Sequence, residues 1–222
     1  VTTPAMRVAW LVFAALFATL NFAGNYAAED DPTREPLYEW GTAVSALIMY
    51  AFIAAIMWAI ARHLEPRVLG LVQPSSWPRA LGYAGGGLVA IFVVLVLLNP
   101  FLDAGEDQGL VPDHWDSSRA APFIANFVVV AIVAPVVEEL TYRGVGFAVF
   151  RDMLGVTPAI IAVGLAFGLA HGLLIALPVL SIFGMILAYV RDRTESIYPA
   201  MLLHATFNSI SLIAGVALGV TA

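Results

Sequence analysis

Residues 122–150 read PFIANFVVVAIVAPVVEELTYRGVGFAVF, the most informative stretch of the chain for its fold. It is longer than the ~20 apolar residues that a helix needs to cross the ~30 Å hydrocarbon core of a membrane. Its second half nevertheless carries Glu138, Glu139 and Arg143. Ionisable side chains at membrane depth cost at least ~2.5 kcal/mol each, so they normally face protein or a water-filled cavity. The stretch therefore predicts a membrane-spanning helix, tilted or extended at one end, that carries a functional site.

The composition of the whole chain also indicates lipid as part of its solvent. Of the 222 residues, 61% are hydrophobic and 12% are charged, against ~45–50% and ~25% in soluble domains. The chain has no cysteine, which excludes disulfides, thiolate metal sites and cysteine nucleophiles. It has no lysine, no basic cluster and a net charge of −6, so nucleic acid is not an expected partner. The expected partner is the lipid bilayer.

Apolar runs along the chain predict an all-α fold, a polytopic transmembrane helical bundle of about seven spans. The expected spans are 5–24, 40–61, 80–102, 122–150, 157–173, 175–190 and 197–219. The fifth and sixth are short. Because the sequence shows no soluble domain and no internal repeat, residues 1–222 are expected to form a single membrane domain.

Arginine is distributed unevenly between the connections of these spans. Six of the ten arginines lie in the second, fourth and sixth connections, and two more lie toward the same side, Arg7 at the start of the first span and Arg143 in the last part of the fourth, whereas acidic residues dominate 28–39 and 103–119. The positive-inside rule then predicts a multi-pass protein of the cell membrane with a cytoplasmic N-terminus and an outside C-terminus. The five tryptophans fall mostly near span ends, where they are expected to anchor the bundle at the membrane interface.

Three polar clusters interrupt the apolar spans. They are EELTYR at 138–143, FGLAH at 167–171 and HATFN at 204–208. Four-residue spacing puts Glu139 and Arg143 on one helix face, where they can pair. Gly164 and Gly168 share a face with His171, and glycines at such spacing let another helix approach closely. His171 is therefore expected to face a tight helix–helix contact and not lipid.

Together these groups could hydrolyse an amide bond without a covalent intermediate. A buried carboxylate such as Glu138 can take a proton from water, and an imidazole such as His171 can orient that water. His204 and Asn208 are four residues apart on one face and can donate hydrogen bonds to an oxyanion. Glu138, His171 and His204 could instead bind Zn²⁺ as a two-histidine, one-carboxylate site, and the residues alone leave both possibilities open.

At these residues the sequence resembles the CAAX-protease and bacteriocin-processing (CPBP) family of intramembrane proteases, which includes the type II CAAX prenyl endopeptidases. That family carries Glu-Glu-x-x-x-Arg, Phe-x-x-x-His and His-x-x-x-Asn/Asp on successive core helices. Here the three motifs occur in that order at 138–143, 167–171 and 204–208. Each motif alone is weak, but the ordered set is specific. The resemblance covers 122–218 and implies a catalytic core formed by the last four spans.

The resemblance also implies a role for each matched side chain. The catalytic group would be Glu138, Glu139, His171, His204 and Asn208, with the last two forming the oxyanion hole. Glu138 would activate water with His171 beside it, while Arg143 and Phe167 would give structural support. No metal cofactor is favoured, because Asn208 is a poor zinc ligand and a good amide donor. If zinc were bound, its ligands would be Glu138, His171 and His204.

The sequence thus predicts an intramembrane endopeptidase that acts on a peptide or a membrane-anchored protein from a cavity open toward the cytoplasm. A glutamate-type mechanism is favoured over a zinc-dependent one. The alternative is a non-catalytic protein that uses the same buried Glu and His, either in immunity against a peptide toxin or in transport. An inverted repeat or a pair of broken helices would favour transport, and the sequence shows neither. The substrate, its prenylation and the oligomeric state are not indicated by the sequence.

Overall fold

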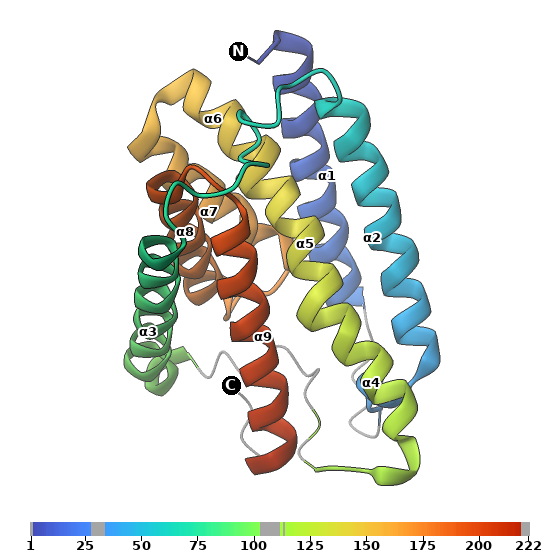
Figure 1. Ribbon diagram of the computed structural model, residues 1–222. Helices are drawn as coiled ribbons and strands as arrows, with labels where there is room; N and C mark the ends of the chain where they lie inside the picture. Colours follow the sequence, from blue (N-terminus) through green and yellow to red (C-terminus); the bar gives the residue numbers. More distant parts are fainter. Residues whose placement is uncertain (1, 28–33, 103–111, 113, 219–222) are drawn as a thin grey trace.

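The computed structural model describes residues 2–27, 34–102, 112 and 114–218, and within these ranges it contains helices and turns but no strand (Figure 1). The separate helices are α1 (Pro4–Ala27), the 3-10 turn η1 (Pro36–Tyr38), α2 (Trp40–Ala61), α3 (Trp77–Leu102), α7 (Val156–Ala170), α8 (Leu177–Thr194) and α9 (Tyr198–Leu218). A continuous helical run lies between α3 and α7. It consists of η3 (Ser117–Arg119), α4 (Ala120–Val128), the π-helix η4 (Val129–Val133), α5 (Ala134–Glu138), the π-helix η5 (Glu139–Gly146) and α6 (Phe147–Leu154). The all-α prediction is confirmed.

Five helices in the described residues are long and apolar enough to cross a membrane. They are Pro4–Ala27, Trp40–Ala61, Trp77–Leu98, Ser117–Leu154 and Tyr198–Ala217. Helix α7 is apolar but has only 15 residues, and α8 ends in the charged sequence Arg191-Asp192-Arg193. Large apolar side chains on α1, α2 and α3 are widely exposed, as lipid-facing surfaces require. The chain is therefore a multi-pass membrane protein, with five of the seven expected spans supported by length and apolarity.

The bundle has two chemically different ends. The N-terminus and the last turns of α2, α6 and α8 lie together at the top of Figure 1, and Arg7 binds Asp152 of α6 there at 2.8 Å. We call this the arginine end. The opposite end, which we call the acidic end, holds η1, the start of α4 and the last turn of α9 (Figure 1). Most acidic residues of 28–39 and 103–119 lie outside the described residues.

Pro135 explains why the long run is not a regular α-helix. Proline lacks an N–H and clashes with the carbonyl four residues earlier, so the helix before it widens into the π-helix η4. Ala134 donates its backbone N–H to the Val129 carbonyl in this wider register. The next bond would join Pro135 to the carbonyl of Val130, and Pro135 has no proton to donate. The Val130 carbonyl is thereby left available to a side chain.

Helices α7 and α8 form a tight hairpin through facing glycines. A Cβ atom on Gly184 would lie 2.8 Å from the Cα of Gly164, and a Cβ on Gly164 would lie 2.7 Å from the backbone nitrogen of Met185. The close helix approach predicted at Gly164 is confirmed. At the tip of the hairpin, Gly172 has a φ of +68° and its backbone lies against Asn21 of α1, where a side chain would have no room.

Trp10 does not anchor the bundle at a membrane interface. It is fully buried, it donates from its ring nitrogen to the Thr141 carbonyl at 3.0 Å, and its ring covers Gly146, where a Cβ would lie 2.4 Å away. The anchoring prediction is therefore wrong for this tryptophan, which packs α1 against η5. The other four are 41–66% exposed: Trp40, Trp58, Trp77 and Trp115.

Candidate active site

The two consecutive glutamates lie where α5 passes into η5, near the centre of the bundle. Because successive helical residues project about 100° apart, Glu138 and Glu139 face different neighbours. The Glu139 side chain is fully buried, whereas the Glu138 side chain is 18% exposed. Only Glu138 therefore reaches open space.

Glu139 forms a buried ion pair with Arg143. Its Oε1 accepts a hydrogen bond from Arg143 Nη1 at 3.0 Å, and both side chains are inaccessible. Arg143 also donates through Nη2 to the Gly184 carbonyl at 3.0 Å, and its guanidinium lies 4.3 Å from the ring centre of Phe167. Arg143 thus joins η5 to both helices of the α7–α8 hairpin.

His204 of α9 lies between the two glutamates. Its Nδ1 is 3.0 Å from Glu139 Oε1, and its Nε2 is 3.7 Å from Glu138 Oε2. Since a carboxylate paired with arginine can only accept, Nδ1 carries the proton and donates it to Glu139. The rings of Phe167 and Phe183 both pack against the imidazole in T-shaped contacts, with ring centres 5.6 and 5.3 Å away. His204 therefore presents Nε2 to Glu138.

Tyr50 of α2 contacts the other oxygen of Glu138. Its hydroxyl donates to Glu138 Oε1 at 2.8 Å. The sequence analysis missed this residue, because a tyrosine in an apolar span resembles any other aromatic side chain there. The available signal was its position at the middle of α2, where a hydroxyl needs a partner inside the membrane.

His171 follows directly on α7. Its Nδ1 lies 2.8 Å from the Phe167 carbonyl, which can only accept, so Nδ1 is the protonated nitrogen and Nε2 has a free lone pair when the ring is neutral. Asn25 of α1 donates to the His171 carbonyl at 3.2 Å and so holds the same turn from outside. The turn around His171 is therefore held by contacts from both α1 and α7.

Asn208 lies one turn beyond His204 on α9. Its Nδ2 donates to the Val130 carbonyl at 2.9 Å, the carbonyl that the π-helix leaves without a backbone donor. An amide nitrogen has two N–H groups. One N–H of Asn208 is therefore not used at Val130, and the residue lines a cavity together with Glu138 and His204.

Two cavities meet at Glu138. The larger, of about 240 Å³, contains all four of Glu138, His171, His204 and Asn208 in its wall. The smaller, of about 140 Å³, lies between α1, α2 and η5. Both are lined by Tyr50, Glu138 and His171. The structure thus brings the three separated sequence motifs to one hollow inside the bundle.

The wall of the larger cavity also shows in which direction it extends. It includes Leu37 of η1 and Leu212 of α9, which pack together near the acidic end. This lining does not support an opening toward the arginine end, where the positive-inside rule places the cytoplasm.

The same side chains also bear on the zinc alternative. Among the described residues, no three His, Asp or Glu side chains are arranged so that they could hold one metal ion. The set Glu138, His171 and His204 therefore does not fit a zinc site in this geometry. The hydrolysis that these residues could carry out is therefore written without a metal, and metal-free catalysis stays a prediction.

These features define a helical, multi-pass membrane protein with a carboxylate, two imidazoles and a carboxamide around an internal cavity. Residues 120–210 match the family model described as "Type II CAAX prenyl endopeptidase Rce1-like". The resemblance expected from the three motifs is thereby confirmed, and this segment identifies the chain as similar to a family of membrane endopeptidases. No curated protein and no solved structure matches the chain significantly.

Proposed function

We propose that the chain is an intramembrane endopeptidase in which Glu138 activates a water molecule for attack on a peptide carbonyl. One observation carries the proposal: Glu138 is held through one oxygen by Tyr50, faces His204 with the other, and lies where two cavities join. A carboxylate fixed in this way can accept a proton from water. The match of 120–210 to membrane endopeptidases supports hydrolysis over other uses of the same groups.

The reaction would proceed without a covalent intermediate. Water in the cavity gives one proton to Glu138 and its oxygen attacks the scissile carbonyl, while the Nε2 lone pair of His171 accepts a hydrogen bond from that water and aligns it. The carbonyl oxygen becomes negatively charged. Glu138 then passes the proton to the leaving nitrogen as the peptide C–N bond breaks. The products are a carboxylic acid and an amine, the acid then gives its proton to the amine to leave a carboxylate and an ammonium group, and the enzyme is unchanged.

His204 and Asn208 would stabilise the developing oxyanion. The second N–H of Asn208 is available for this, because only one is used at Val130. His204 can donate through Nε2 when its ring carries both protons, and two carboxylates lie next to the ring to balance that charge. Glu139 and Arg143 would then hold His204 in place.

A matched pair of variants tests this proposal. We expect Glu138→Gln to lower the cleavage rate of a prenylated CAAX peptide by about 10²–10⁴-fold, the usual contribution of a general base. Glu195→Gln, an equal charge change at an exposed residue of the arginine end, should leave the rate unchanged. In cells, Glu138→Ala and His171→Ala should each abolish whatever phenotype distinguishes cells that make this protein from cells that lack it. A full phenotype with both variants would instead favour the non-catalytic immunity or transport role.

The side from which substrate enters is a separate part of the proposal. We infer a cytoplasmic N-terminus from the arginine distribution, and the chain offers a direct test because it contains no cysteine. Arg62→Cys, at the arginine end, should be labelled by a membrane-impermeant thiol reagent from the cytoplasmic side. Ser211→Cys, in the cavity wall, should be labelled from the same side on a cytoplasmic opening and from outside on an opening toward the acidic end, where Leu37 and Leu212 line the cavity. Labelling of Ser211→Cys from outside the cell would overturn the cytoplasmic opening.

A further inference from the structure

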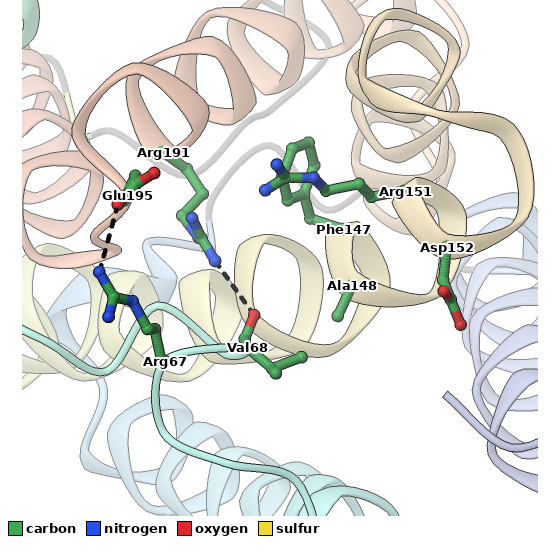
Figure 2. Close-up of a pocket in the computed structure, with 8 residues that line it drawn as sticks. All are labelled: Arg67, Val68, Phe147, Ala148, Arg151, Asp152, Arg191 and Glu195. Atoms are coloured by element: carbon green, nitrogen blue, oxygen red, sulfur yellow. Dashed lines mark hydrogen bonds and ion pairs between the residues drawn. The ribbon is translucent and has the colours of Figure 1, made fainter. Parts of the chain in front are cut away.

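A third cavity, of about 360 Å³, lies at the arginine end (Figure 2). It is an open hollow lined by the loop after α2, by α6 and by the end of α8. Phe147 in its wall is nine residues from Glu138 along the continuous helical run, and no residue lines both this cavity and the two at Glu138. It is a separate site.

Arg191 is the buried part of this cavity. Its side chain is 3% exposed, its Nη2 donates to the Val68 carbonyl at 3.1 Å, and its Nε has no hydrogen-bond partner. Gly70, with a φ of +71°, leaves the space for the guanidinium, since a Cβ there would lie 2.5 Å from Nε. A buried cation is costly unless an anion lies near enough to balance its charge.

The acidic residues in the wall are engaged elsewhere or bound weakly. Asp152 binds Arg7 at 2.8 Å and points away from the three arginines in Figure 2. Glu195 lies 3.9 Å from Arg67, and both side chains are more than 70% exposed. Ion pairs that are long and exposed contribute little. Glu195 therefore competes only weakly for its arginine.

Arg67 and Arg151 lie on either side of Arg191 in Figure 2. Arg151 is 4.0 Å from Asp192, a long contact that an incoming anion can replace. Three guanidinium groups around one hollow match the planar, multidentate geometry in which arginine binds phosphate oxygens. Val68, Phe147 and Ala148 supply an apolar wall beside them.

We propose that this cavity binds a phosphate group, carried by an anionic lipid headgroup or free in solution. Basic pockets between membrane helices on the arginine-bearing side are where such headgroups bind. The buried Arg191 would contact the phosphate through Nη1, since Nη2 is bonded to the Val68 carbonyl and Nε lies against Gly70, and Arg67 and Arg151 would bind it from either side. This site is independent of peptide hydrolysis, so its test does not depend on the proposed function.

The test measures the thermal unfolding of the full chain in neutral detergent. Phosphatidylglycerol should raise Tm with increasing concentration, and phosphatidylcholine should not. The double variant Arg67→Gln/Arg151→Gln should weaken the apparent affinity about thirtyfold, because two arginine–phosphate contacts are lost. The matched control Arg62→Gln/Arg79→Gln removes the same charge from exposed residues of the same end that do not line the cavity, and it should bind as the unaltered chain does.

A second arm distinguishes the two sources of phosphate. Sodium phosphate is compared with sodium chloride at equal ionic strength, without lipid. A rise in Tm with phosphatidylglycerol alone identifies a lipid headgroup, and an equal rise with inorganic phosphate identifies a soluble ligand. The proposal is overturned if neither raises Tm, or if the control pair weakens binding as much as the cavity pair, because the attraction would then be non-specific.

Discussion

The hydrogen bond from Tyr50 to Glu138 yields the sharpest prediction. Tyr50→Phe removes one hydroxyl and leaves the ring in place. The lost contact is a 2.8 Å bond to a carboxylate, and hydrogen bonds to charged groups are worth about 1.5–3 kcal/mol. Without it, Glu138 is free to rotate away from the water that it activates. Tyr50 is thus a positioning residue, which acts on the reaction through the carboxylate.

The expected effect is a fall in kcat of about 10- to 100-fold with little change in KM. The lower limit corresponds to about 1.4 kcal/mol of the transition-state barrier, and misplacement of a catalytic group by ~1 Å costs about 10²-fold. The assay is steady-state cleavage of a fluorogenic peptide by purified protein in detergent. A Tm measurement accompanies it, because a merely structural role for Tyr50 would lower Tm and leave kcat per folded molecule unchanged.

Tyr142→Phe is the matched control. Tyr142 lines the same small cavity as Tyr50, and its hydroxyl is buried without a hydrogen-bond partner. Removing an unsatisfied hydroxyl costs nothing in contacts and relieves a desolvated group, so both kcat and Tm should be kept or slightly raised. The reasoning is refuted if Tyr50→Phe retains full kcat, or if the two variants lose activity equally.

Three further predictions concern stability and chemistry. Arg143→Met should lower the free energy of unfolding in mixed micelles by about 3–5 kcal/mol, because the buried Glu139 carboxylate loses its cation. Adding Glu139→Gln to this variant should recover part of the lost stability. Strictly additive losses from the two substitutions would contradict the pairing. Cleavage should survive 1,10-phenanthroline, and loss with rescue by Zn²⁺ would overturn the metal-free mechanism. At the acidic end, hydrogen bonds from Ser118 and Arg119 hold the pKa of the Asp116 carboxyl well below its usual range. The Asp116 carboxylate stabilises the fold fully above its unfolded pKa of about 3.9, and this stabilisation is lost as the pH falls through the lower pKa of the folded state. The difference in Tm between the unaltered chain and Asp116→Asn should therefore be constant above about pH 5 and vanish in stronger acid.

Much of the architecture could be predicted from the sequence because it depends on local properties. The length and apolarity of each run mark the helices that can cross a membrane. Gly164 predicted a close helix contact because the absence of a side chain is itself the cause of the contact. The three motifs pointed to residues that the fold brings around one cavity, since charged and amide side chains inside an apolar span need a polar environment.

Which side of each apolar helix faces protein depends on how the helices pack against one another. In a soluble helix, the polar face marks the surface, but a helix in lipid is apolar all round, because lipid tails and the protein interior are equally apolar. The sequence therefore could not show that Tyr50 reaches Glu138 or that Trp10 is buried against η5. It also could not show that His204 contacts both glutamates, because 65 residues separate it from Glu139 and only helix packing sets that distance.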